Sequence, residues 1–167
     1  MPTEADLLEA LDRTSALVKA GAVPPTVTSR VARVTRIVRD TIPLLPRMGA
    51  GSPEAYSVMA TATDYLPEAI TGYLRLPRSF ADHRPVDRGK TSLMILVDQL
   101  DLLGSTMDRV FDAVCREDAA ALVAHGRFLQ EKFGHAAAGG ALAIDSSLPV
   151  PDQPDQQQLQ PPPATPG

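Results

Sequence analysis

The sequence predicts an all-α protein, an antiparallel bundle of about five helices followed by a disordered C-terminal tail. Over most of the first 134 residues, apolar residues recur at intervals of three and four, the spacing of one face of an α-helix. No segment has the alternation of a half-buried strand or a hairpin signal. Mostly short connections that contain glycine and proline separate the apolar segments, as in antiparallel bundles.

Two apolar segments open the chain and predict helices over residues 3–20 and 26–41. Thr3 and Asp6 have the spacing of a capping box, and Gly21 is typical of a helix end. The first apolar stripe is Leu7, Leu8, Leu11, Leu17 and Val18. The second stripe is Val27, Val31, Val34, Ile37 and Val38. The second set is β-branched, but its spacing favours a helix over a strand.

A third helix is predicted from a clear start signal. Ser52 supplies an N-cap hydroxyl, Pro53 suits the first helical position, and Glu54 places an acid in the first turn. The apolar spacing continues to Leu76. Pro67 lies inside this helix, where proline removes one backbone hydrogen bond and clashes with the preceding turn. We therefore expect a kink at Pro67, or two shorter helices that meet near residues 64–66.

After a polar loop over residues 77–90, two more helices are predicted, over residues 91–116 and 118–134. The stripe of the fourth helix is Leu93, Leu96, Val97, Leu100, Leu103, Met107, Val110, Phe111 and Val114. In the fifth helix we expect Leu122, Val123, Leu129 and Phe133 to face inward. The break at residues 116–117 is weak, so the two segments also fit one bent helix.

The composition changes after Gly134. Residues 149–167 contain seven prolines and five glutamines but no lysine, arginine or aromatic residue. Such a segment cannot bury enough apolar area to offset the entropy lost on ordering. The sequence therefore predicts a helical domain over residues 1–134 and a disordered Pro/Gln-rich tail over residues 135–167.

The composition also excludes several classes of protein. The chain has 44% hydrophobic and 22% charged residues and a net charge of −4, a balance typical of globular proteins. Its one cysteine, Cys115, cannot form an intrachain disulfide. The longest run of bulky aliphatic residues, 93–97, is too short for a membrane span, and the acidic N-terminus does not resemble a signal peptide. We therefore expect a cytoplasmic protein without a transmembrane segment.

No catalytic residue, metal site or cofactor is predicted. Gly89-Lys90-Thr91-Ser92 resembles the end of a phosphate-binding loop, but Arg84 stands where that motif requires glycine. A Thr or Ser cap of the fourth helix explains the same residues. The three histidines and the single cysteine have no metal-ligand spacing.

The second helix carries four arginines, Arg30, Arg33, Arg36 and Arg39. Three of them lie opposite the valine stripe, and Arg30 borders it. This arginine face fits an anion, an acidic partner or a membrane surface, and it equally fits a plain solvated face. The fourth helix carries the complement on its polar side: Asp98, Asp101, Asp108 and Asp112. This acidic face also fits a plain solvated surface. The alternative hypothesis is that the arginine face of one copy, or of a partner, contacts it.

The segment around Pro67 is the most distinctive in composition. Tyr65, Pro67 and Tyr73 fit either a core in which the tyrosine hydroxyls bond kinked backbone or a ligand groove at the kink. Residues 64–74, Asp-Tyr-Leu-Pro-Glu-Ala-Ile-Thr-Gly-Tyr-Leu, resemble a pattern in small helical bacterial proteins named for 5-bromo-4-chloroindolyl phosphate hydrolysis, some of them associated with toxic-anion resistance. The whole chain also resembles actinobacterial proteins, which implies an actinobacterial source and no activity. The resemblance implies an all-helical accessory protein and assigns no catalytic residue.

These observations favour a non-enzymatic helical interaction module, an adaptor or accessory protein of the stress response or cell envelope. Its partner would be another protein or a second copy in a homo-oligomer. Peripheral contact with a membrane is also compatible with the sequence. One alternative is a phosphate-ester hydrolase whose arginines clamp the phosphate. That site would draw on Arg30, Arg33, Arg75, Arg78 and Arg84 with Asp64, Glu68 or His83 as base. The other is a binder of nucleic acid or anionic membranes, although few aromatic residues and the overall charge disfavour nucleic acid.

Overall fold

The computed structural model describes residues 1–49 and 51–134. The chain divides into two compact units, Met1–Glu117 and Asp118–Gly167, and the described part of the second unit ends at Gly134. The predicted all-α fold is confirmed, since helices account for most of the described residues. The predicted tail over residues 135–167 lies outside the described residues, so its disorder remains a prediction.

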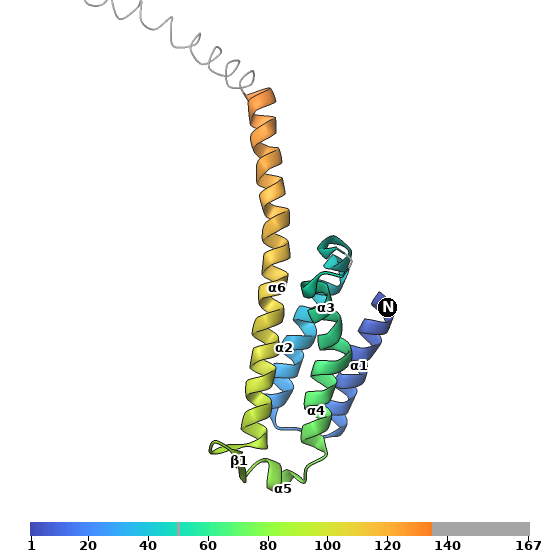
Figure 1. Cartoon of the computed structure of the whole chain (residues 1–167), viewed down its shortest axis with the longest axis vertical. Helices are drawn as coiled ribbons and strands as arrows, with labels where there is room; N and C mark the ends of the chain where they lie inside the picture. Colours follow the sequence, from blue (N-terminus) through green and yellow to red (C-terminus); the bar gives the residue numbers. More distant parts are fainter. Residues whose placement is uncertain (50, 135–167) are drawn as a thin grey trace, which may run out of the picture. The chain divides into compact units, whose positions relative to one another are not determined.

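The first unit is built from helices that run alternately up and down (Figure 1). Its elements are α1 (Glu4–Ala20), α2 (Pro25–Thr41), the 3-10 helix η1 (Ile42–Met48), α3 (Pro53–Ala60), the π-helical turn η2 (Thr61–Tyr65), α4 (Leu66–Leu74), α5 (Arg78–Ala81), β1 (Pro85–Asp87) and β2 (Lys90–Thr91). Helix α6 (Ser92–Leu129) begins in this unit and continues into the second, where a π-helical turn, η3 (Gln130–Gly134), follows it.

Local signals set the helix starts. Thr3 donates its backbone N–H to Asp6 Oδ2 at 2.8 Å, and Asp6 N–H donates to Thr3 Oγ1 at 3.1 Å, so the predicted capping box is present. The hydrogen bonds from the Thr3 backbone and side chain hold the pKa of the Asp6 carboxyl below its usual value. Ser52 Oγ accepts from Ala55 N–H at 3.1 Å and caps α3, again as predicted.

The core of the first unit follows the predicted stripes closely. Every member of the second stripe is buried: Val27, Val31, Val34, Ile37 and Val38. In α1, however, Leu17 is exposed, and Thr14 is buried on that helix instead. Thr14 tolerates burial because its hydroxyl donates to the carbonyl of Ala10 at 3.2 Å.

The predicted kink at Pro67 is not confirmed, and the segment instead contains two shorter α-helices, as the alternative predicted. The chain passes from α3 through the π-helical turn η2 into α4, and Pro67 is the second residue of α4. Leu66 N–H donates to the carbonyl of Thr61, five residues earlier. The wider turn just before the proline adjusts the backbone where the ring would clash with a regular α-turn.

The predicted loop over residues 77–90 contains a short helix and a hairpin that the sequence reading missed. β1 pairs with β2 antiparallel, with Pro85 opposite Thr91 and Asp87 opposite Lys90. The turn residues Arg88 and Gly89 both have positive φ, as hairpin turns require. Thr91 Oγ1 then accepts from Met94 N–H at 3.2 Å, which confirms the predicted cap of the next helix.

The fourth and fifth predicted helices form one helix, α6, so the alternative without a break at residues 116–117 is the correct one. The four residues expected to face inward in its last part do not. Leu122 is 72% exposed, Val123 52%, Leu129 40% and Phe133 60%. This is the largest departure from the sequence prediction.

Candidate functional site

Helical residues of the second unit expose a group of large apolar side chains. We call this group, Leu122, Val123, Phe128, Leu129 and Phe133, the apolar surface of the second unit. The sequence favours a helix here because four of residues 118–134 are alanine, the strongest helix former, and glycine occurs only at Gly126 before the end. Exposed apolar groups of this size are typical of interaction sites.

Within the apolar surface, Phe128 has neighbours from its own helix. The His125 ring stacks on it with centroids 6.2 Å apart, and Lys132 Nζ lies 5.8 Å from the ring centroid. Leu122 and Leu129, seven residues apart, share one side of the helix with Phe133 four residues further on. These three side chains form the part of the apolar surface that is best placed to contact another molecule.

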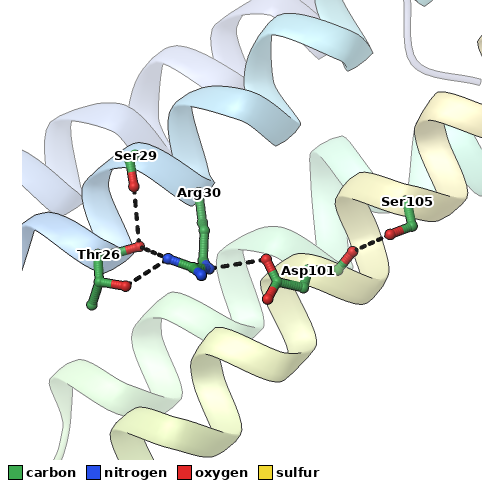
Figure 2. Close-up of polar contacts among 5 residues, drawn as sticks. All are labelled: Thr26, Ser29, Arg30, Asp101 and Ser105. Atoms are coloured by element: carbon green, nitrogen blue, oxygen red, sulfur yellow. Dashed lines mark hydrogen bonds and ion pairs between the residues drawn. The ribbon is translucent and has the colours of Figure 1, made fainter.

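The arginine face divides between two neighbouring helices. Arg30 Nε donates to Asp101 Oδ1 at 2.9 Å, and its Nη1 donates to the carbonyl and hydroxyl of Thr26 at 3.0 and 2.6 Å (Figure 2). Ser29 donates to the same Thr26 carbonyl, and Ser105 donates to the carbonyl of Asp101. Arg30 therefore links α2 to the first-unit part of α6.

The other three arginines have different surroundings. Arg33 lies beside Gly104, where an added Cβ would be 2.7 Å from Arg33 Nη1. Arg39 forms an ion pair with Asp12 of α1. Arg36 and Arg39 line a groove of about 360 Å³ together with Ser15, Ala32, Thr35 and Asp40. Thus two arginines contact or approach α6, and two border a groove next to α1.

Three of the four predicted acidic residues already have partners in the same chain. Asp98 pairs with Lys90, Asp101 with Arg30, and Asp112 with Arg116 at 2.7 Å. Asp108 is exposed. The structure brings Arg30 and Asp101 together within one chain, and contact between these faces of two copies stays a prediction.

Tyr73 is buried and fixes the end of α4. Its hydroxyl donates to Asp82 Oδ1 at 2.6 Å, and the Arg78 guanidinium lies 5.1 Å from the ring centroid. Burial, with this hydrogen bond to Asp82, raises the pKa of Tyr73 to about 12. Tyr73 is thus a neutral hydrogen-bond donor near pH 7.

Tyr65 and Tyr73 meet at one groove, and Pro67 lies at another. The first groove, of about 460 Å³, runs between α4 and α6, and Glu68 and Gln99 also line it. Pro67 borders a separate groove of about 490 Å³ against α1. The three residues predicted for a groove at the kink therefore do not line a common cavity.

The residues of the alternative phosphate site are dispersed in the first unit. Arg78 donates to the backbone carbonyls of Gly21 and Ala22 at 2.9 and 3.1 Å. Arg84 lies over the Phe80 ring at 5.9 Å. The groove that contains Glu68 has no arginine in its lining. The grooves lined by Glu68, by Pro67 and by Arg36 do not join these arginines to the proposed bases.

Within residues 1–49 and 51–134, no group of three His, Cys, Asp or Glu side chains is placed to hold a metal ion. None of the helices in that part of the chain has the length and apolar character needed to cross a membrane. Comparisons with protein-family models, with curated proteins and with solved structures found no match to this chain.

The sequence pattern identified four of the five residues of the apolar surface, all except Phe128, and assigned them to the core. Apolar spacing assigns side chains to one face of a helix and does not report whether another element covers that face.

Proposed function

We propose that this chain is a non-enzymatic protein-interaction module that binds through the apolar surface of the second unit. The observation that carries the proposal is the exposure of four large side chains, each at least half exposed, within a short helical segment: Leu122, Val123, Phe128 and Phe133. Exposed apolar area is costly in water, and docking recovers that free energy.

The helix itself supports the same role. In proteins, packing of an amphipathic face supplies most of the stability of a helix, and the apolar residues of this segment are exposed. A bound partner would therefore stabilise the helical segment, and burial of the apolar surface would contribute to the affinity of the complex. The resemblance of residues 64–74 to accessory proteins of toxic-anion resistance points to the same class of function.

Affinity capture from the native cell extract tests the proposal. We compare the wild-type chain with Leu129→Glu, which places a charge in the middle of the apolar surface, and with Leu102→Glu as the matched control. Leu102 is an exposed leucine of the same helix within the first unit. We expect Leu129→Glu to lose proteins that the wild type and the control both retain. Equal retention by all three chains would contradict the proposal.

A further inference from the structure

The apolar surface of the second unit is bordered by a regular series of polar residues. Asp118, His125 and Lys132 follow one another at intervals of seven, so they lie along one flank of Leu122 and Leu129. The other flank carries Ala119, Gly126 and Phe133, again seven apart, so its first two positions are small and its last is a large ring. The segment thus has leucines in the centre, a charged flank and a flank that is small over residues 119–126.

We propose that this segment pairs with the same segment of a second copy, as an antiparallel two-helix contact. The inference rests on the proposed function and names the partner. In an antiparallel pair the charged flank of one helix faces the charged flank of the other in reverse order. Asp118 then lies opposite Lys132 of the second copy, and Lys132 opposite its Asp118. The dimer would therefore contain two equivalent Asp118–Lys132 pairs, one on each side of its two-fold axis.

The same register also fits the shapes of the core residues. With Asp118 opposite Lys132, Leu122 packs against Gly126 of the second copy and Leu129 against its Ala119. Each leucine therefore meets a small residue, the alternation that lets two helix surfaces interdigitate. At Gly126 a Cβ would meet no atom within 4 Å, so the structure leaves this position open for an incoming side chain. Charge and shape select one register.

A parallel pair does not use these features. In parallel pairs the charged flank of one helix faces the opposite flank of the other. Asp118 and Lys132 would then face Ala119, Val123, Gly126 or Gln130, which carry no charge. The antiparallel pair is also two-fold symmetric, the commonest symmetry of protein dimers.

The first test measures the mass of the full chain in solution across a dilution series. We expect a dimer for the wild type and a dissociation constant at least about tenfold weaker for Lys132→Glu, which opposes Asp118 with a second acid. The double variant Asp118→Lys/Lys132→Glu exchanges the charges in both copies and is expected to recover dimerisation. Failure of the double variant to recover while the single variant is weakened would overturn the antiparallel register.

The second test reports orientation directly. His125 lies at the centre of the pair, opposite His125 of the second copy, so His125→Cys in a Cys115→Ser background should form a disulfide-linked dimer with a mild oxidant. Ala124→Cys, one residue away on the outer side of the helix, is the matched control and should remain unlinked. Linkage through Ala124→Cys but not through His125→Cys would overturn the proposal.

The outcomes separate this inference from the proposed function. A monomeric wild type whose Leu129→Glu variant still loses captured proteins would overturn self-pairing and leave the interaction module standing. A monomeric wild type with unchanged capture would overturn both. A dimer that survives Leu129→Glu and both charge variants would show that another surface makes the dimer and would overturn the pairing proposed here.

Discussion

One helix, α6, has two different environments along its length. In the first unit, Leu96, Leu100 and Met107 are at most 2% exposed. In the second unit, Leu122 is 72% exposed although it belongs to the same kind of apolar pattern. Spacing determines which side chains share a face, and neighbouring elements determine whether that face is buried. The comparison shows that an apolar stripe identifies a face that favours burial, and that the stripe alone does not establish that this face is buried.

The two environments have different energetic consequences. Full burial of a leucine contributes about 1.5–3 kcal/mol, and a cavity adds to the cost when a buried leucine is removed. An exposed leucine forfeits most of that contribution until something binds it. The first unit therefore depends on its stripe for folding, whereas the second unit keeps the equivalent free energy available for association.

The largest expected effect comes from truncating one leucine in each region. Leu100→Ala should lower the free energy of unfolding by about 2–5 kcal/mol, because Leu100 is 1% exposed in the core. Leu122→Ala should change the unfolding of the first unit by less than about 0.5 kcal/mol. Urea denaturation followed by circular dichroism, at a protein concentration where the chain is monomeric, measures both. Similar losses for the two variants would remove the distinction between the regions.

Buried and exposed aromatic residues give the next contrast. Tyr73→Phe should cost about 1–2 kcal/mol, because it removes the hydrogen bond to the Asp82 carboxylate. Phe133→Ala, at a ring that is 60% exposed, should leave the first unit nearly unchanged. Chemical denaturation near pH 7 measures both. A smaller loss for Tyr73→Phe than for Phe133→Ala would contradict the burial pattern.

The pH dependence of Tyr73 sharpens this prediction. Its pKa is raised to about 12, so the folded state favours the neutral hydroxyl more than the unfolded state does. The resulting stability is fully present below about pH 10, the unfolded value, and is lost as pH rises through the folded value. The difference in unfolding free energy between wild type and Tyr73→Phe should therefore shrink between pH 10 and 12. A constant difference would show that the hydroxyl does not titrate as described.

Much of the first unit could be predicted from the sequence because its signals are local. The capping pair Thr3 and Asp6 and the start signal at Ser52 satisfy backbone donors within three residues. The valine stripe of α2 was predictable because spacing alone assigns a face. The hairpin turn was missed because Arg88 with Gly89 is not among the common turn pairs, although both adopt positive φ.

The candidate site was harder to predict because it depends on tertiary neighbours. The four arginines share one side of α2 in the sequence, but their long side chains reach different partners, Arg30 to α6 and Arg39 to α1. Pro67 suggested one groove, yet Pro67 and Tyr73 line separate grooves. The exposure of Leu122 likewise depends on which elements lie nearby, which periodicity does not report.

Two glycines of α6 test the comparison with a smaller effect. Gly126→Ala should stabilise the local helix by up to about 1 kcal/mol, since alanine has the higher helix propensity and no atom lies within 4 Å of the new Cβ. Gly104→Ala should stabilise the helix less, because the new Cβ would lie 2.7 Å from Arg33 Nη1 and the guanidinium would have to move. Hydrogen exchange of nearby amides measures each variant. A larger gain at Gly104 would indicate that Arg33 moves without cost.

The smallest expected effect concerns the ion pair that joins α2 to the first-unit part of α6. Arg30 and Asp101 contact at 2.9 Å, but their side chains are 34% and 51% exposed, so solvent screens the attraction. A double-mutant cycle with Arg30→Met and Asp101→Asn should give a coupling of about 0.2–1 kcal/mol that falls as salt increases from 50 mM to about 0.5 M. Met keeps most of the aliphatic length of the arginine, so the cycle reports charge more than packing. A coupling above about 2 kcal/mol, or one insensitive to salt, would contradict the prediction that solvent screens this exposed ion pair.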